Sequence, residues 1–230
     1  MHIGTKQDSP LYIMNDHYNH TTLINKSKCE KDLGVLINDS LTPSNHITEI
    51  VKKANRVLWC IKQSFSYLEP DMFVVLYKSM VRPVLEYASP VWSPFLKKDI
   101  LKIEQVQRRA TKLIPSLHNL SYSDRLLKLG LPTLLYRRDR QDLINVYNII
   151  TSDPNNSLFE IDAEPRVRNN GVKIKKTEHY NRHIRQHFFT QRIINVWNKL
   201  PSHVVKSKSL NCFKSALNDT NWHCQKFTLQ

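Results

Sequence analysis

The sequence predicts a mainly α-helical chain with a small β portion at its N-terminus. From about residue 45 to residue 150, apolar residues recur at spacings of three and four, the period of a helix with one buried face. Before residue 44, short apolar or β-branched runs alternate with polar turns, a pattern typical of short strands. Of the 230 residues, 40% are hydrophobic, which is enough for the core of one large or two small domains.

Three short strands are expected in the first segment. Leu11–Met14 and Thr21–Ile24 are apolar or β-branched and are separated by polar residues. The third is expected over Lys31–Asp39, with Gly34 inside it and a turn through Pro43 after it. This is too little β structure for a stable sheet of its own.

The clearest amphipathic helix begins near His46, with Ser44 or Asn45 as its expected N-cap. Its polar face is basic, with Lys52, Lys53, Arg56 and Lys62. Its expected buried positions are Ile47, Ile50, Val51, Ala54, Val57, Leu58, Ile61 and Phe65.

Two further helices follow. Pro70 suits the first turn of the next one, and Pro83 is expected to kink or end it because proline lacks a backbone donor. An aromatic turn punctuated by prolines contains Trp92, and a third helix then runs from about Lys98 to Leu113. The stripe expected to be buried in the first of the two is Phe73, Leu76, Tyr77, Met80 and Val81.

Capping residues mark the next two helices. Ser121 with Asp124 predicts a helix start, and Gly130 its end. Thr133 begins the following helix, which is expected to reach about Ile150.

The remaining chain is less regular. Residues 151–170 are polar and contain two prolines, which indicates a linker. A helix is expected over His187–Pro201, and Ser209 caps a last short one. The predicted organisation is a β segment over 1–44, a helical domain over 45–150, a linker over 151–170 and a basic helical C-terminal segment over 171–230.

The charge balance points to a polyanionic partner. Lysine and arginine number 34 against 20 acids, a net charge of +14. Such a surface binds nucleic acid by releasing the condensed counterions of its phosphates. A single basic helix face is more often merely solvated, but several together predict a phosphate-binding surface. The candidate nucleic-acid-binding residues are Lys52, Lys53, Arg56, Arg108, Arg109, Lys112, Arg137, Arg138 and Arg140. Trp92 is the candidate for stacking on a base, against the commoner role of a helical aromatic in the core.

The sequence gives little support for a membrane-spanning, secreted or metal-binding protein. No apolar run approaches the about 18 residues of a membrane-spanning helix, and the first residues lack the apolar stretch of a signal peptide. An intracellular chain, in nucleus or cytoplasm, is therefore expected, with no membrane partner; a basic module at an anionic membrane surface is the alternative. His179, His183 and His187 share a four-residue spacing but lack further ligands at a suitable offset, so no metal site is expected.

Catalytic motifs are missing as well. Polymerase chemistry uses paired aspartates that hold two divalent ions, and the chain has no Asp-Asp dipeptide. Its four glycines form no phosphate-binding loop. No catalytic residue is predicted.

Six segments, taken in order, resemble the region that follows the polymerase palm in reverse transcriptases of non-LTR (LINE-type, jockey-like) retrotransposons. They are EKDLGVLIND (30–39), KANRVLWCIK (53–62), LYKSMVRPVLEYASPVWSP (76–94), IEQVQRRATKLI (103–114), LPTLLYRRDRQDLI (131–144) and FFTQRIINVWNKLP (188–201).

The resemblance implies that residues 1–44 are the end of the palm and residues 45–150 the thumb. It implies RNA or an RNA–DNA duplex as ligand, and the missing palm and fingers of the parent polymerase as partner. The intact RNA-directed DNA polymerase would use two divalent metal ions such as Mg²⁺. This chain lacks the catalytic aspartates and is expected to need no cofactor and to be inactive alone. The alternative is a relic or gene-model fragment of a transposable element with no selected activity.

Overall fold

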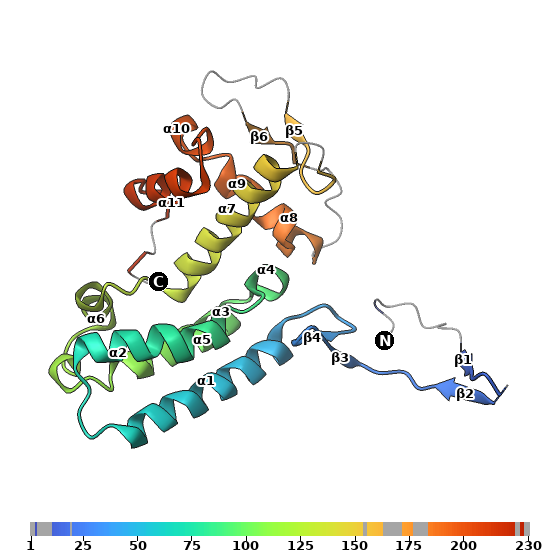
Figure 1. Cartoon of the computed structure of the whole chain (residues 1–230), viewed down its shortest axis with the longest axis horizontal. Helices are drawn as coiled ribbons and strands as arrows, with labels where there is room; N and C mark the ends of the chain where they lie inside the picture. Colours follow the sequence, from blue (N-terminus) through green and yellow to red (C-terminus); the bar gives the residue numbers. More distant parts are fainter. Residues whose placement is uncertain are drawn as a thin grey trace.

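A computed structural model describes residues 3, 11–18, 20–153, 156–162, 172–176, 184–223 and 226–227. These residues form a mainly helical protein with small antiparallel hairpins, which confirms the predicted fold class at that level. Figure 1 shows two layers, with the helices of the first half below and those of the second half above. Among the described residues, no helix is both long and apolar enough to cross a membrane.

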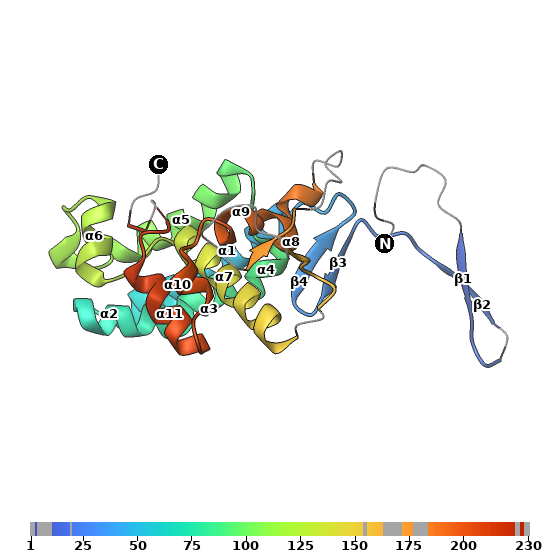
Figure 2. The same ribbon diagram turned by 90° about the horizontal axis from the view of Figure 1, so that it is seen from above.

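The first two predicted strands form a hairpin that stands apart from the helices. β1 (Tyr12–Asn15) pairs antiparallel with β2 (Thr21–Ile24), and every residue of both strands is exposed. Figure 2 shows this hairpin well separated from the helical body. An isolated two-stranded hairpin is only marginally stable in water.

The prediction of a single strand over Lys31–Asp39 is wrong, because the chain folds back on itself in this segment. β3 (Cys29–Asp32) and β4 (Val35–Asn38) form an antiparallel hairpin. Leu33 and Gly34 make its two-residue turn with φ of 43° and 87°. A turn with two positive φ angles matches the twist of a hairpin, and the glycine provides one of them without strain.

The first helix, α1 (Ser44–Ser64), buries the predicted stripe except at two positions: Val57 is only partly buried, and Phe65 is 36% exposed. The predicted N-cap is wrong: the helix starts at Ser44, and no side chain caps it. The Ser44 hydroxyl instead donates to Asp99 Oδ2 at 2.6 Å, which fixes the start of α1 against the next long helix.

Pro83 does not end its helix. α2 (Pro70–Leu76) continues through a π-helical turn, η1 (Tyr77–Val81), into α3 (Arg82–Glu86). The wider π turn lies just before Pro83, and it is one of the ordinary ways in which a helix accommodates a distortion. Met80, predicted to be buried, is 47% exposed.

The short α4 (Ser89–Trp92) leads to α5 (Lys97–Thr111) and, after a 3₁₀ turn, to α6 (Tyr122–Leu129). The predicted ends of α6 are confirmed. Ser121 Oγ accepts the Asp124 amide at 3.2 Å, and Gly130 closes the helix with a φ of 58°.

The longest helix of the second half is α7 (Leu134–Ser152), capped by Thr133, whose Oγ1 accepts the Tyr136 amide at 3.2 Å. The single helix predicted over His187–Pro201 is wrong, because the chain there makes short turns. These are η3 (Arg185–His187), α8 (Phe189–Arg192) and α9 (Ile194–Trp197), followed by α10 (Ser202–Val205).

Two further elements complete the second half. β5 (Ile161–Asp162) pairs with β6 (Lys173–Ile174), so part of the predicted linker is a strand. The last helix, α11 (Leu210–Asp219), is capped by Ser209 as predicted.

The buried apolar side chains form two clusters. One joins Val35 of β4 to the helices from α1 to α6, and the other joins the later part of α7 to α9, α10 and α11. Trp197 and Phe213 lie at the centre of the second cluster, 1% and 0% exposed. Helix α7 contributes to both clusters, so it couples the two layers. The predicted segment boundaries stay predictions.

Candidate nucleic-acid interface

A basic hollow of about 460 Å³ lies where the C-terminal half of α5 meets the start of α6. Three of the predicted nucleic-acid-binding residues meet in it. Its lining residues are Gln105, Arg108, Arg109, Lys112, His118, Leu120, Ser121, Tyr122 and Arg125. Of the described residues, none with a carboxylate lines the hollow. We call it the α5–α6 hollow.

The helical period of α5 explains why its cations face outward. Ile103, Val106 and Ala110 are fully buried against the first cluster. Arg108 and Arg109 fall between these positions, Lys112 follows Ala110 at the end of the helix, and all three are exposed. A helix with one buried stripe must turn the intervening residues to the opposite face.

Arg125 is a fourth cation of the hollow that the sequence analysis missed. It is 3% exposed, yet it lines the hollow. Its Nε donates to Thr111 Oγ1 at 3.0 Å and its Nη1 to the Leu120 carbonyl at 2.6 Å. These bonds tie α6 to the end of α5. A charged residue beside Leu126 on the apolar stripe of α6 is the feature that would have revealed it.

Two of these guanidinium groups lie close to the aromatic ring of Tyr122. Arg108 Cζ is 4.5 Å from the ring centroid, and Arg125 Cζ is 5.7 Å from it. Cations are attracted to the face of an aromatic ring. Burial lowers the pKa of Arg125, and the charge of Arg108 lowers it further. Because like charges are held together here and no described carboxylate lines the hollow, an anion would be stabilised.

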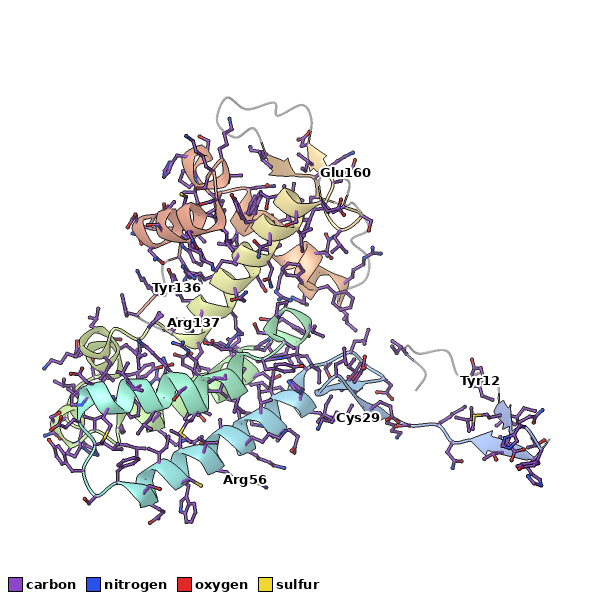
Figure 3. The ribbon with its side chains drawn as sticks, in the orientation of Figure 1. Tyr12, Cys29, Arg56, Tyr136, Arg137 and Glu160 are labelled. Carbon is purple, nitrogen blue, oxygen red and sulfur yellow. The ribbon has the colours of Figure 1, made fainter. Side chains whose placement is uncertain are left out.

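The basic face predicted for α1 is exposed. Lys52, Lys53 and Arg56 all reach solvent, and Lys52 forms an ion pair with Glu49 at 3.1 Å. Figure 3 shows Arg56 on the outer edge of α1. An aromatic side chain also lies on this helix, since Trp59 is 62% exposed.

Two of the three arginines predicted from α7, Arg137 and Arg140, form polar contacts within the protein. Arg137 forms a two-point ion pair with Glu86, with Nη2 and Oε2 2.8 Å apart, and Figure 3 shows it at the start of α7 above the lower layer. The Glu86 carboxylate is thus the anion that compensates for a cation in the first turns of a helix. Arg140 Nη2 donates to the Lys214 carbonyl and to Asn218 Oδ1, each at 3.2 Å.

Arg138 and Trp92, predicted to contact nucleic acid, are both buried. Arg138 is 2% exposed and Trp92 is 3% exposed. The Trp92 indole N–H donates to the Tyr87 carbonyl at 2.6 Å, and its ring lines an apolar hollow of about 420 Å³. A base cannot stack on a buried ring, so the exposed Trp59 replaces Trp92 as the stacking candidate.

The histidine series falls mostly outside the described part of the chain. His179 and His183 lie outside the described residues, and the His187 ring stacks on Phe95 with centroids 4.0 Å apart. Within the described residues, no three His, Cys, Asp or Glu side chains lie close enough to hold a metal ion together.

One buried ion pair between α7 and α8 should make stability depend on pH. Asp142 Oδ2 lies 2.8 Å from Arg192 Nη2. Burial raises the pKa of Asp142 to about 6, against the opposing effect of the Arg192 charge. An aspartate in an unfolded chain has a pKa of about 3.9. The folded protein therefore binds the proton more tightly, and this contribution to stability falls as the pH rises from about 4 to about 6.

Asp142→Asn should remove that dependence. On going from about pH 7.5 to about pH 5, we expect the free energy of unfolding of the wild type to gain about 1 kcal/mol relative to the variant. Urea unfolding of both proteins at the two pH values measures this difference, in which the other titrating groups cancel. A difference between the proteins that stays constant with pH would contradict the assignment.

The fold and the hollow together define a mainly helical protein with a cationic surface hollow, which no carboxylate of the described residues lines and which is therefore the kind of surface that binds phosphate. Compared with known proteins, the chain matches no family model, no curated protein and no solved structure.

Proposed function

We propose that this chain is the thumb and C-terminal part of a LINE-type retrotransposon reverse transcriptase and that it binds the nucleic-acid backbone of a template–primer duplex. The observation that carries the binding proposal is the α5–α6 hollow. It holds Arg108, Arg109, Lys112 and Arg125 together with no lining carboxylate among the described residues. Contacts to phosphate position a duplex without reading its sequence, so the binding is expected to be independent of sequence.

The identity proposed for the chain rests on the six resembling segments. The segment over residues 103–114 contains three of the four cations of the hollow. The predicted role as a thumb is further supported by the helical first layer, in which α1 and α5 pack side by side. The catalytic aspartates would lie in the parent polymerase, so the chain alone is proposed to bind and not to polymerise.

The β1–β2 hairpin fits a chain that works as part of a larger assembly. It exposes Tyr12 by 58%, Ile13 by 61% and Met14 by 60%, with Leu23 and Ile24 beside them half exposed. Apolar side chains gathered on a marginal hairpin favour a missing partner surface. The same exposure favours the second candidate, a relic without selected activity, which predicts poor solubility. Soluble expression with cooperative unfolding would count against that candidate.

Binding to a labelled RNA–DNA duplex, measured by fluorescence anisotropy at several salt concentrations, tests the binding proposal. Four phosphate contacts predict that the logarithm of the binding constant falls with the logarithm of salt concentration with a slope of about −3 to −4. An affinity that does not change with salt would contradict it. Binding to anionic liposomes that RNA fails to displace would instead support the membrane-surface alternative.

A further inference from the structure

Arg138 of α7 has a buried guanidinium group without a hydrogen-bond partner. The side chain is 2% exposed, and its Nε, Nη1 and Nη2 atoms donate to nothing among the described residues. Buried polar groups are almost always paired, and an unpaired charge is far more costly than an unpaired neutral group. Such a group in a folded protein therefore calls for a ligand.

The carboxylates around Arg138 are used by other groups. Both oxygens of Glu86 accept from Arg137. Glu104 accepts from the Tyr122 hydroxyl and from the Leu134 amide.

The two acids of α7 itself have partners too. Asp139 Oδ2 contacts His223, and Asp142 Oδ2 contacts Arg192. The other Asp142 oxygen is buried without a partner, one helical turn from Arg138, but forms no ion pair with it. None of the neighbouring acids thus satisfies the guanidinium group.

Arg138 forms part of the wall of a hollow of about 250 Å³ between α7 and the junction of α3 and α4. The only lining carboxylate among the described residues is that of Glu86, which is already paired. The rest of the polar wall consists of Arg137, which is paired with Glu86, and of neutral hydrogen-bonding side chains. The lining residues are Glu86, Ala88, Ser89, Pro90, Arg137, Arg138, Gln141 and Asn145. We call this space the α3–α7 hollow.

We propose that the α3–α7 hollow binds a phosphate group, with Arg138 as the residue that pairs with it. The planar guanidinium group donates two parallel hydrogen bonds to phosphate oxygens. The Ser89 hydroxyl and the Gln141 and Asn145 amides line the hollow from two different elements, so they suit the remaining oxygens of a tetrahedral anion. A water occupies about 30 Å³ in the liquid, so the space accommodates a phosphate with several waters.

This site does not depend on the proposed function. Arg138 lies outside the α5–α6 hollow, whose lining residues it does not share. Loss of duplex binding and loss of phosphate binding in the α3–α7 hollow are therefore separate results.

The experiment measures thermal unfolding of the whole chain in increasing inorganic phosphate, with ionic strength held constant by sodium chloride. A ligand that binds only the folded state at 100 times its Kd raises the folded-to-unfolded ratio about 100-fold. The temperature midpoint of unfolding should therefore rise with phosphate concentration in the wild type. Calorimetric titration with phosphate should find one binding site that remains when the cations of the α5–α6 hollow are removed. Arg138→Met should remove the part of the rise that comes from the α3–α7 hollow and leave only the part that depends on Arg108, Arg109 and Lys112. A triple variant with Arg108, Arg109 and Lys112 changed to Gln should keep the part that comes from the α3–α7 hollow.

A second variant leaves Arg138 in place. Gln141 is exposed on the rim of the hollow, three residues along α7 from Arg138. Gln141→Glu should supply a carboxylate to the guanidinium group, raise the midpoint of unfolding without phosphate, and remove the part of the phosphate response that comes from this hollow. Gln63→Glu, the same change at an exposed position of α1, should leave the response intact.

Three results would overturn the proposal. The first is a wild-type midpoint that does not respond to phosphate beyond sodium chloride. The second is an Arg138→Met protein that responds as the wild type does. The third, which decides if Arg138→Met does not fold, is a Gln141→Glu protein that keeps the full response.

Discussion

Replacement of Glu104 by leucine is expected to lower the free energy of unfolding by about 3–5 kcal/mol. Glu104 is fully buried on α5. Its Oε1 accepts the Tyr122 hydroxyl at 2.5 Å, and its Oε2 accepts the Leu134 amide at 3.0 Å. A leucine side chain accepts no hydrogen bond, so the variant would leave the buried Leu134 amide unpaired and the Tyr122 hydroxyl without its acceptor.

The effect is expected to be large because this network joins several helices. The Gln107 amide nitrogen lies 3.1 Å from Tyr122 Oη and 3.1 Å from the Pro132 carbonyl, and Gln107 Oε1 accepts the Tyr77 hydroxyl at 2.7 Å. The bonds thus connect η1, α5 and α6 to the start of α7. Burial raises the pKa of Glu104, while the hydrogen bond from Tyr122 lowers it.

Guanidinium chloride unfolding of a small set of variants separates the contributions. Glu104→Gln keeps the shape and one acceptor, and it should cost about 1–2 kcal/mol. Tyr122→Phe should cost about 1 kcal/mol, and in a double-mutant cycle with Glu104→Leu the two effects should not add. A loss below about 1 kcal/mol in Glu104→Leu would show that these bonds do not stabilise the fold.

The second large effect concerns binding. Replacing Arg108, Arg109 and Lys112 together by glutamine should weaken binding to an RNA–DNA duplex by about 100-fold near 0.1 M salt. It should also reduce the magnitude of the salt slope by about 3. Each of these side chains is exposed and lies in the α5–α6 hollow, so the change removes three phosphate contacts without opening the core. Anisotropy titrations at several salt concentrations measure both quantities.

A matched control distinguishes the hollow from general charge. Changing Lys199, Lys206 and Lys208 to glutamine removes the same three charges from exposed positions of the second layer. That variant should lose less than about tenfold in affinity, because it changes net charge without removing contacts. Equal losses of affinity in the two triple variants would mean that duplex binding depends only on the net charge of the protein and not on the α5–α6 hollow.

Local sequence patterns predicted the elements whose causes are local. The apolar spacing of residues 47–61 and 100–113 matches α1 and α5 because a helix with one buried face needs that period. Ser121, Thr133 and Ser209 cap their helices because a short polar side chain can reach an unpaired amide two or three residues on.

Predictions failed where contacts between distant residues decided the outcome. Ser44 was expected to cap α1, but its hydroxyl is bound by Asp99, fifty-five residues away. The segment over residues 187–201 carries enough apolar residues for one helix, yet it folds as short turns that pack around Trp197. No periodicity within a segment reports such partners.

The same distinction applies to the candidate site. The amino-acid sequence alone determined that the protein is strongly cationic and that some of its helices have a basic face, because both net charge and helical period can be read from the order of residues. Only the tertiary structure decided which cations meet solvent. It placed Arg125 in the wall of a hollow and buried Arg138, because the exposure of a side chain depends on which helix faces come together.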